Sequence, residues 1–435
     1  MTGPDDRAVA DTVVIGGGLA GLLAAITAAT AAPARSRVVV LEPHALGGRA
    51  RCDQRDGFTF NRGPRALYAD GIADRALRAV GVDTSTGGKP TFTDPVAIHD
   101  GILHRFPGSA LDSARTTLFT PRQKVAVSRT LAALWRADEE RTEGLSVSAW
   151  LDQRGATGVV RQFVEALVRV STYANAPEVF AAGPALANAR AGISPGVRYV
   201  DGGWQSLVDQ LAALAGSLGV EVRSAAARGI EAEPDGTVAV LHDGGPRIRA
   251  TSVIVAAGGP VAAIALLGHR PESWRELAPA VTAACLELGL SSPPTHRFAL
   301  GIDEPLYAST HCPPADLAPE GGAVVHLMRY QPADDDLPAT DQQALLHGLA
   351  ARIGITREQI VTERFLARMV VAGTVPGAAT GGLGGRPAVE VPEHPGVLLA
   401  GDWVGADGLL LDCVAASATE AGRRAAARSA TMVPA

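Results

Sequence analysis

The sequence predicts an α/β protein in which a domain built on a parallel sheet carries a second, α+β domain as an insertion. Three observations favour this architecture. The chain opens with an apolar strand, a glycine turn, a helix and another apolar strand; a similar pattern returns near residue 200; and an apolar strand near residue 397 leads into a helix of small residues. A length of 435 residues suits two or three domains. We expect the first domain to comprise residues 1–70, 195–265 and 390–435, and the inserted domain to comprise residues 71–194 and 266–389.

The opening segment has the pattern of a βαβ unit. Val13–Ile15 and Val38–Leu41 are uninterrupted apolar runs, which are typical of strands in a parallel sheet that is covered on both faces. Between them, three glycines form a turn, and Leu19–Ala31 is rich in alanine and leucine, as expected of a helix.

The later segments alternate between the two expected domains. Residues 121–190 follow helical periodicity and carry no dinucleotide motif. Gly202 and Gly203 lead into a helix that Gly219 ends. We further expect strands at 220–223 and 237–241 that pair as a hairpin or meander, buried strands at 252–256 and 397–400, and a last helix from about Cys413 to Ala427.

Gly16, Gly18 and Gly21 form a G-x-G-x-x-G motif between the first strand and the first helix. The first glycine makes the turn, the second lets backbone N–H groups approach a pyrophosphate, and the third lets helix and strand pack closely. Glu42 ends the second strand, where its carboxylate can accept hydrogen bonds from ribose hydroxyls. The motif therefore predicts a Rossmann-like dinucleotide site.

Two further segments extend this site. Gly47–Arg49 combines two glycines, which allow close backbone approach, with a guanidinium that can hold a phosphate. Ala400–Trp403 follows the last strand, and the Asp402 carboxylate can bond a ribityl hydroxyl. The helix beginning near Cys413 would point its positive end at a flavin ring. Together these features predict FAD as the cofactor.

At these positions the sequence resembles the superfamily of FAD-dependent amine oxidases and phytoene desaturases. The similarity runs through seven segments between Val13 and Ala421, at both ends and in the middle of the nucleotide-binding domain. It implies a Rossmann-like FAD-binding domain with an inserted α+β substrate domain, and FAD along their interface. By motif match, Gly16, Gly18 and Gly21 would contact the pyrophosphate, Glu42 the ribose, Arg49 the phosphate side and Asp402 the ribityl chain. Further FAD contacts are implied at Leu19, Ala20, Pro43, Gly48, Gly63, Pro64, Arg65, Ala227, Ala257, Gly401, Leu410 and Leu411.

The sequence departs from the pattern of the superfamily in three places. The spacer between Glu42 and Gly47 is one residue shorter, Asn61 stands where Asp is usual, and the adenine-side strand at 225–229 lacks the usual Val. These departures concern local contacts and leave the cofactor prediction unchanged.

A flavin N5 can take a hydride from a C–H bond activated by an amine or by an unsaturated system. The resemblance therefore leads us to expect a desaturase or dehydrogenase that acts on a small or medium organic substrate, in specialised metabolism. An oxygen-dependent amine oxidase is the alternative. Many amine oxidases of the superfamily place a lysine near N5, whereas this chain has only Lys89 and Lys124, both in the expected insertion. The electron acceptor, whether oxygen, a quinone or another compound, is left open.

Two hypotheses from other classes also fit part of the pattern. A FAD-free escort protein of the same fold would tend to lose the complete phosphate fingerprint, which is intact here. A NAD-dependent dehydrogenase would leave Gly47–Arg49 and Gly401–Asp402 unexplained. The fingerprint therefore favours a FAD enzyme over both.

The candidate catalytic residues are Arg65 and Tyr68, which follow Gly63–Pro64 where the chain should leave the flavin edge, and Trp403. These candidates and the substrate-binding candidates named below also have ordinary explanations. Arg65 would be an ion-pair partner, Tyr173 a packed ring and His326 a hydrogen-bonded core histidine. Cys413 is better explained as a small residue at a helix start than as a covalent flavin attachment. Candidate substrate-binding residues are Tyr173, Asn175, His326, Arg329 and Tyr330, and Asp407 and Asp412 flank the isoalloxazine by motif position.

Composition narrows the class further. The net charge of −6 disfavours a nucleic-acid partner. The four cysteines form no CxxC pair, so free thiols in a reducing, cytoplasmic setting are expected, with no metal site. Thr12–Ala32 carries no charge, but its glycines and alanines indicate a buried strand and helix in place of a membrane span.

Overall fold

A computed structural model describes residues 9–32 and 36–432 of the chain. Its first sheet has seven strands in the order β10–β11–β12–β1–β2–β9, and β18 pairs with β12. The chain is a mixed α/β protein, as predicted. The parallel strands are β1 (Ala10–Ile15), β2 (Val38–Leu41), β9 (Glu221–Arg223), β12 (Ile248–Val255) and β18 (Val397–Leu399), and the antiparallel edge consists of β10 (Ala227–Ala232) and β11 (Val238–His242).

The expected pairing of 220–223 with 237–241 is wrong. β9 lies at the far edge of the sheet beside β2, while β11 lies between β10 and β12 at the other edge. The reason is that β9 follows the helix α9 (Trp204–Ser217), and a helical crossover delivers a strand parallel to its neighbour, whereas tight antiparallel turns join β10, β11 and β12.

The helices that cover the first sheet include α1 (Leu19–Ala31), α9 and α12 (Leu410–Met432), and α10 (Pro260–Leu267) packs against β10. α1 has the predicted bounds and packs against both α9 and α12. α12 starts three residues earlier than expected and ends later. Its Gly422 lies so close to α1 that a Cβ there would come within 2.6 Å of the Ala24 carbonyl oxygen and of the Thr27 Cβ.

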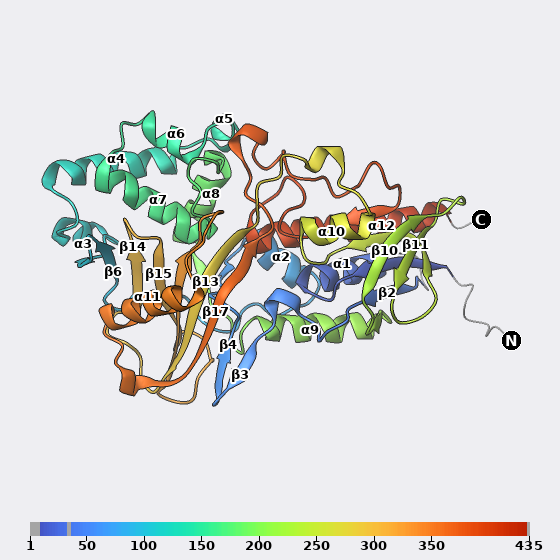
Figure 1. Cartoon of the computed structure of the whole chain (residues 1–435), viewed down its shortest axis with the longest axis horizontal. Coiled ribbons are helices and arrows are strands. Elements are labelled where there is room, and N and C mark those ends of the chain that lie inside the picture. Colours follow the sequence, from blue (N-terminus) through green and yellow to red (C-terminus); the bar gives the residue numbers. More distant parts are fainter. Residues whose placement is uncertain (1–8, 33–35, 433–435) are drawn as a thin grey trace.

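A second seven-stranded sheet lies at the other end of the molecule's long axis (Figure 1). It is antiparallel apart from the parallel pair of β14 with β6. The helix α11 (Ala339–Arg352) packs on one face through Leu346 and Leu349, and α4 (Pro121–Trp135) and α7 (Gly158–Thr172) pack on the other face. In order across the sheet, its strands are β17 (Ile360–Ala372), β13 (Val281–Leu290), β16 (Ala323–Tyr330), β15 (Leu306–Cys312), β14 (Phe298–Gly301), β6 (Val96–His99) and β7 (Ile102–Arg105).

Short elements connect the two sheets. Two small ribbons pair β3 with β4 and β5 with β8, and they carry the chain between the sheets. Among the described residues, no helix is long and apolar enough to cross a bilayer. The remaining elements are β3 (Asp53–Arg55), β4 (Phe58–Phe60), β5 (Leu67–Tyr68), β8 (Val197–Arg198), α2 (Ile72–Ala79), α3 (Ala110–Arg115), α5 (Glu139–Thr142), α6 (Val147–Asp152), α8 (Ala182–Ile193) and α10 (Pro260–Leu267).

The close contact of α1 with α12 predicts the effect of adding one methyl group. We expect Gly422→Ala to lower the free energy of unfolding by about 1–3 kcal/mol, because the backbone of α1 must move to accept the new Cβ. Gly348→Ala is the matched control, since Gly348 also lies inside a helix but has open space around it. Alanine there should be neutral or stabilising by up to about 1 kcal/mol. Urea titrations in which both variants shift the midpoint equally would contradict the prediction.

Candidate active site

The glycine turn after β1 is built by close backbone contacts. Gly16 has φ +110°, and a Cβ there would lie 2.7 Å from the carbonyl oxygen of Ala256. A Cβ on Gly21 would lie 1.8 Å from the carbonyl oxygen of Gly16, so only glycine lets α1 start so close to the strand. No side chain caps the start of α1, and its first turn holds no acidic residue. The N–H groups of this first turn therefore suit an anion such as a pyrophosphate.

Glu42 lies beside this turn. Its Oε2 accepts the N–H of Gly17 at 2.8 Å, and its Oε1 accepts the N–H of His44 at 3.0 Å. These two bonds fix the carboxylate and leave each oxygen a further lone pair for a hydroxyl. The geometry fits the ribose contact that the sequence predicts.

The Asp402 carboxylate is the point where distant segments meet. Its Oδ2 accepts Arg49 Nη1 at 2.8 Å and the N–H of Gly373 at 3.2 Å. Its Oδ1 is buried and has no hydrogen-bond partner in the described structure. A buried carboxylate oxygen without a donor is costly, and a ribityl hydroxyl would satisfy it. The same ion pair raises the pKa of Arg49. The donor and acceptor set of this region therefore fits FAD.

Asp412 and Cys413, at the start of α12, both have structural partners within the protein. Asp412 accepts the N–H of Ala73 at 2.8 Å and so caps α2, and burial raises its pKa. The Cys413 thiol is buried against the carbonyls of Gly401 and Val404, and burial raises its pKa to about 11. A protonated, enclosed thiol has a structural role, which agrees with the preferred interpretation of Cys413. Asp407 is exposed.

The loop after β4 contains Gly63 and Arg65. The N–H of Gly63 donates to Glu287 Oε1 at 2.7 Å, across 224 residues of sequence. Arg65 donates to the carbonyl of Arg49 at 3.0 Å and lies over the Trp204 ring at 5.3 Å. Its Nε is buried without a partner, and burial, with the nearby Arg49 charge, lowers its pKa. Arg65 therefore sits between the flavin motifs with one donor to spare.

Glu287 is a site residue that the sequence did not reveal. It is fully buried on β13 and forms an ion pair with Arg364 of β17, which in turn pairs with Asp53. His326 Nδ1 lies 3.2 Å from Glu287 Oε1. Cys285, Glu287 and His326 bring possible metal-binding atoms within 4.8 Å of one another, a cluster that sequence spacing could not show. We assign no ion to it, because the Arg364 guanidinium already neutralises the carboxylate.

All five tyrosines of the chain, three of them buried and two half-buried, gather in one place, which we call the tyrosine cluster. It consists of Tyr68, Tyr173, Tyr199, Tyr307 and Tyr330. Tyr173 follows α7 with φ +58°, and its ring lies 6.3 Å from the rings of both Tyr307 and Tyr330. Burial raises the pKa of all five hydroxyls. No local motif marks Tyr199 and Tyr307, so the sequence did not predict them as site residues. The small number of tyrosines in the chain was the one available indication that they belong together.

Several predicted substrate residues have other partners. Arg329 is held by Asp335 through two bonds of 2.7 and 2.8 Å and by Gln342 of α11, on the face of the sheet opposite to Tyr330, so we leave it out of the proposed site. Strand alternation alone could have separated the two. Asn175 accepts from Arg169 at 3.3 Å. The Tyr68 hydroxyl donates to the Ser171 carbonyl at 2.8 Å and accepts from Asn188 Nδ2 at 3.1 Å, so its hydrogen bonds are made within the protein.

The remaining predicted cofactor and catalytic residues lie in or next to the segments described above. Trp403 is 2% exposed and packs edge-on against Trp274 at 5.2 Å, which favours a structural role beside Asp402. Asn61 stands where Asp is usual, and its Oδ1 accepts the N–H of Trp204, the first residue of α9, at 2.8 Å. Leu19 and Ala20 begin α1, Pro43 and Gly48 lie exposed beside Glu42 and Arg49, Pro64 is buried after Gly63, Ala227 begins β10, Ala257 follows β12, and Leu410 and Leu411 begin α12.

Comparisons with solved structures reveal the same fold in known proteins. An oxidoreductase from Methanosarcina mazei aligns with a TM-score of 0.74 at 17% identity, covering 94% of this chain and 99% of that one. A putative protoporphyrinogen oxidase from Exiguobacterium sp. 255-15 gives 0.73 at 20%, covering 96% and 98%. A putrescine oxidase bound to putrescine gives 0.70 at 17%, covering 97% and 98%. At these identities the likeness establishes the fold.

A comparison with curated proteins finds no match. The family model of flavin containing amine oxidoreductases matches residues 19–429, nearly the whole chain, and the matched range includes Gly21, Glu42 and Asp402. This chain therefore belongs to the flavin-containing amine oxidoreductase family, and it is a FAD-dependent oxidoreductase.

Proposed function

We propose that the enzyme dehydrogenates a neutral or acid-bearing organic substrate of small or medium size, which lies between the Gly63–Arg65 loop and the tyrosine cluster. FAD, when bound, supplies the hydride acceptor at N5. The observation that carries this proposal is the positive charge of two side chains beside the cluster. Two guanidinium groups flank it. One is Arg65, whose pKa the nearby Tyr173 hydroxyl raises in part, and the other is Arg169, which lies 5.6 Å from the Tyr330 ring.

The charges disfavour a protonated amine. Arg65 and Arg169 would repel an ammonium group, while the nearby Glu287 carboxylate is neutralised by Arg364. The two lysines offer no help near the flavin motifs: Lys124 donates to the Ala114 carbonyl at 2.7 Å, and Lys89 is exposed. A substrate with hydroxyl, carbonyl or carboxylate groups would instead find tyrosine hydroxyls and guanidinium donors.

We also propose the roles of the residues that hold FAD. The N–H groups at the start of α1 receive the pyrophosphate, Glu42 accepts from the ribose, and Asp402 Oδ1 accepts from the ribityl chain. Their support is the open helix start, the fixed Glu42 carboxylate and the unpaired buried oxygen of Asp402. Arg65 would orient the substrate with its spare Nε–H.

An oxygen-dependent amine oxidase is the second candidate, and one observation favours it. The faces of five tyrosines gathered in one place attract cations, and an amine could bind among them. The two candidates differ in the substrate that reduces the flavin and in how fast oxygen reoxidises it.

The charge argument predicts which substrates bleach the flavin. In anaerobic mixing, we expect the absorbance near 450 nm to fall with neutral or carboxylate-bearing compounds that carry an activated C–H bond, and to persist with primary amines. In the control variant Lys124→Met, the substrate should reduce the flavin at the wild-type rate. Faster bleaching by amines than by neutral compounds would reverse the ranking of the two candidates.

The geometry of Asp402 predicts the effect of removing its charge. Asp402→Asn should weaken FAD binding by about 1.5–3 kcal/mol, roughly ten- to a hundred-fold, because a hydrogen bond to a charged group is lost. Asp336→Asn is the control, since Asp336 is an exposed aspartate away from the flavin motifs. FAD content after gel filtration and the dissociation constant from fluorescence titration measure the difference. Equal values for the two variants would remove Asp402 from the cofactor site.

A further inference from the structure

His311 is a fully buried histidine for which the proposed site has no role so far. It lies on β15, and its ring stacks on the Tyr199 ring with 3.7 Å between centroids and 13° between planes. Its Nε2 lies 3.0 Å from the Ser309 hydroxyl, and its Nδ1 is buried without a hydrogen-bond partner. Burial, with the neighbouring His326, holds its pKa well below the ordinary value. At neutral pH the ring is therefore uncharged and has one nitrogen free to accept a proton.

A series of hydroxyl groups connects this ring with the tyrosine cluster. Burial raises the pKa of Tyr307, and the hydrogen-bonding neighbours Ser309, Tyr199 and Tyr173 lower it in part. Ser309 in turn contacts His311. Hydroxyl groups both donate and accept, so a proton that enters at Tyr173 or Tyr307 can leave through Ser309 onto Nε2 of His311. Because these tyrosines resist ionisation, they would pass protons on without holding a charge.

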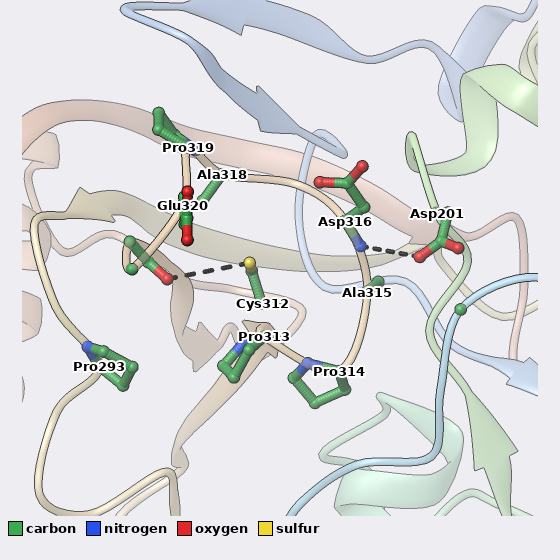
Figure 2. A pocket seen from close by; sticks show the side chains of 13 residues that line it. Asp201, Pro293, Cys312, Pro313, Pro314, Ala315, Asp316, Ala318, Pro319 and Glu320 are labelled. Carbon is green, nitrogen blue, oxygen red and sulfur yellow. Dashed lines mark hydrogen bonds between the residues drawn. The ribbon is translucent and has the colours of Figure 1, made fainter.

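Residues that neighbour His311 and Tyr199 in the chain line a surface hollow. Figure 2 shows this hollow, which is lined by Cys312, Pro313 and Pro314 immediately after His311 and by Asp201, two residues after Tyr199. Gly87 also lines it, and a Cβ there would lie 2.0 Å from the Tyr199 carbonyl oxygen. The hollow carries carboxylates that can receive a proton and give it to water: Asp201, Asp316 and Glu320.

We propose that His311, with Ser309 and Tyr199, relays the proton released by substrate oxidation from the tyrosine cluster to the surface hollow beside Cys312. Dehydrogenation breaks two bonds to hydrogen in the substrate. One hydrogen leaves as hydride, with both bonding electrons, and goes to FAD. The other leaves as a proton, and its bonding electrons form the new double bond of the product. The inference rests on the proposed function and adds the route of this proton.

The groups that face His311 suit a relay. His326 of β16 lies edge-on at 4.3 Å, and beyond it the Glu287 carboxylate is paired with Arg364. Tyr199 covers the other face of the ring. No described carboxylate is paired directly with His311, so the imidazole can accept a proton and release it again instead of being trapped as a stable ion pair.

Stopped-flow reduction of the holoenzyme tests the relay. His311→Phe keeps a flat ring against Tyr199 but removes both nitrogens. We expect flavin reduction about 10²-fold slower, the low end of what positioned proton transfer contributes, with a changed solvent deuterium isotope effect and unchanged FAD content. In His311→Ala, added imidazole should restore part of the rate through the hollow, and a ring with only a structural role would not be rescued this way.

The control is His394→Phe, which removes a histidine that stacks on His269 at 4.9 Å elsewhere in the molecule. It should leave the rate and the isotope effect unchanged. A His311→Phe enzyme with the wild-type rate and isotope effect would overturn the relay. So would a variant altered only in KM, which would mark the stack as a gate for substrate entry.

A second measurement needs no turnover. In the 15N-histidine NMR spectrum of the wild-type holoenzyme, His311 should be neutral at pH 7, and an imidazolium signal would overturn the relay because a charged ring cannot accept a proton. If no compound reduces the wild-type flavin, the proposed function is lost and the relay with it, whereas an imidazolium signal in an enzyme whose flavin is reduced by substrate overturns the relay alone.

Discussion

Three parts of the chain depend on one carboxylate, that of Asp402. It follows the strand β18, pairs with Arg49 from the N-terminal segment and accepts the N–H of Gly373 after β17. A buried charge must be compensated, so these three segments cannot separate without a large cost in free energy. The same constraint leaves Oδ1 directed to a partner other than protein, which is how a structural ion pair also becomes part of a cofactor site.

A second buried network connects the second seven-stranded sheet with the loop that contains Gly63 and Arg65. Glu287 of β13 holds the N–H of Gly63 and the guanidinium of Arg364, and Asp53 completes the network from the β3–β4 ribbon. The second seven-stranded sheet, the β3–β4 ribbon and the Gly63 loop thus share one set of charges. Because Arg62 also pairs with Asp53, two guanidinium groups balance the two carboxylates of the network, which positions the loop.

The electrostatics of the tyrosine cluster follow from this arrangement. With Glu287 paired to Arg364, the guanidinium groups of Arg65 and Arg169 lie beside the cluster. Hydroxyl groups that resist ionisation line the space between them and can bind polar groups or hand on protons. The family supplies the flavin chemistry, whereas the choice of substrate would depend on these few side chains, in which relatives of 17–20% identity are free to differ.

The sequence alone determined the α/β class, the bounds of α1 and the cofactor, because the turn at Gly16–Gly21 and the carboxylates Glu42 and Asp402 act through local backbone geometry and fixed spacing. Only the tertiary structure decided what surrounds the proposed substrate site. Glu287 lies 224 residues from Gly63, and five scattered tyrosines meet in one cluster. Arg329 and Tyr330 are neighbours in sequence but point to opposite faces of a strand, so their roles depend on which face the rest of the fold buries.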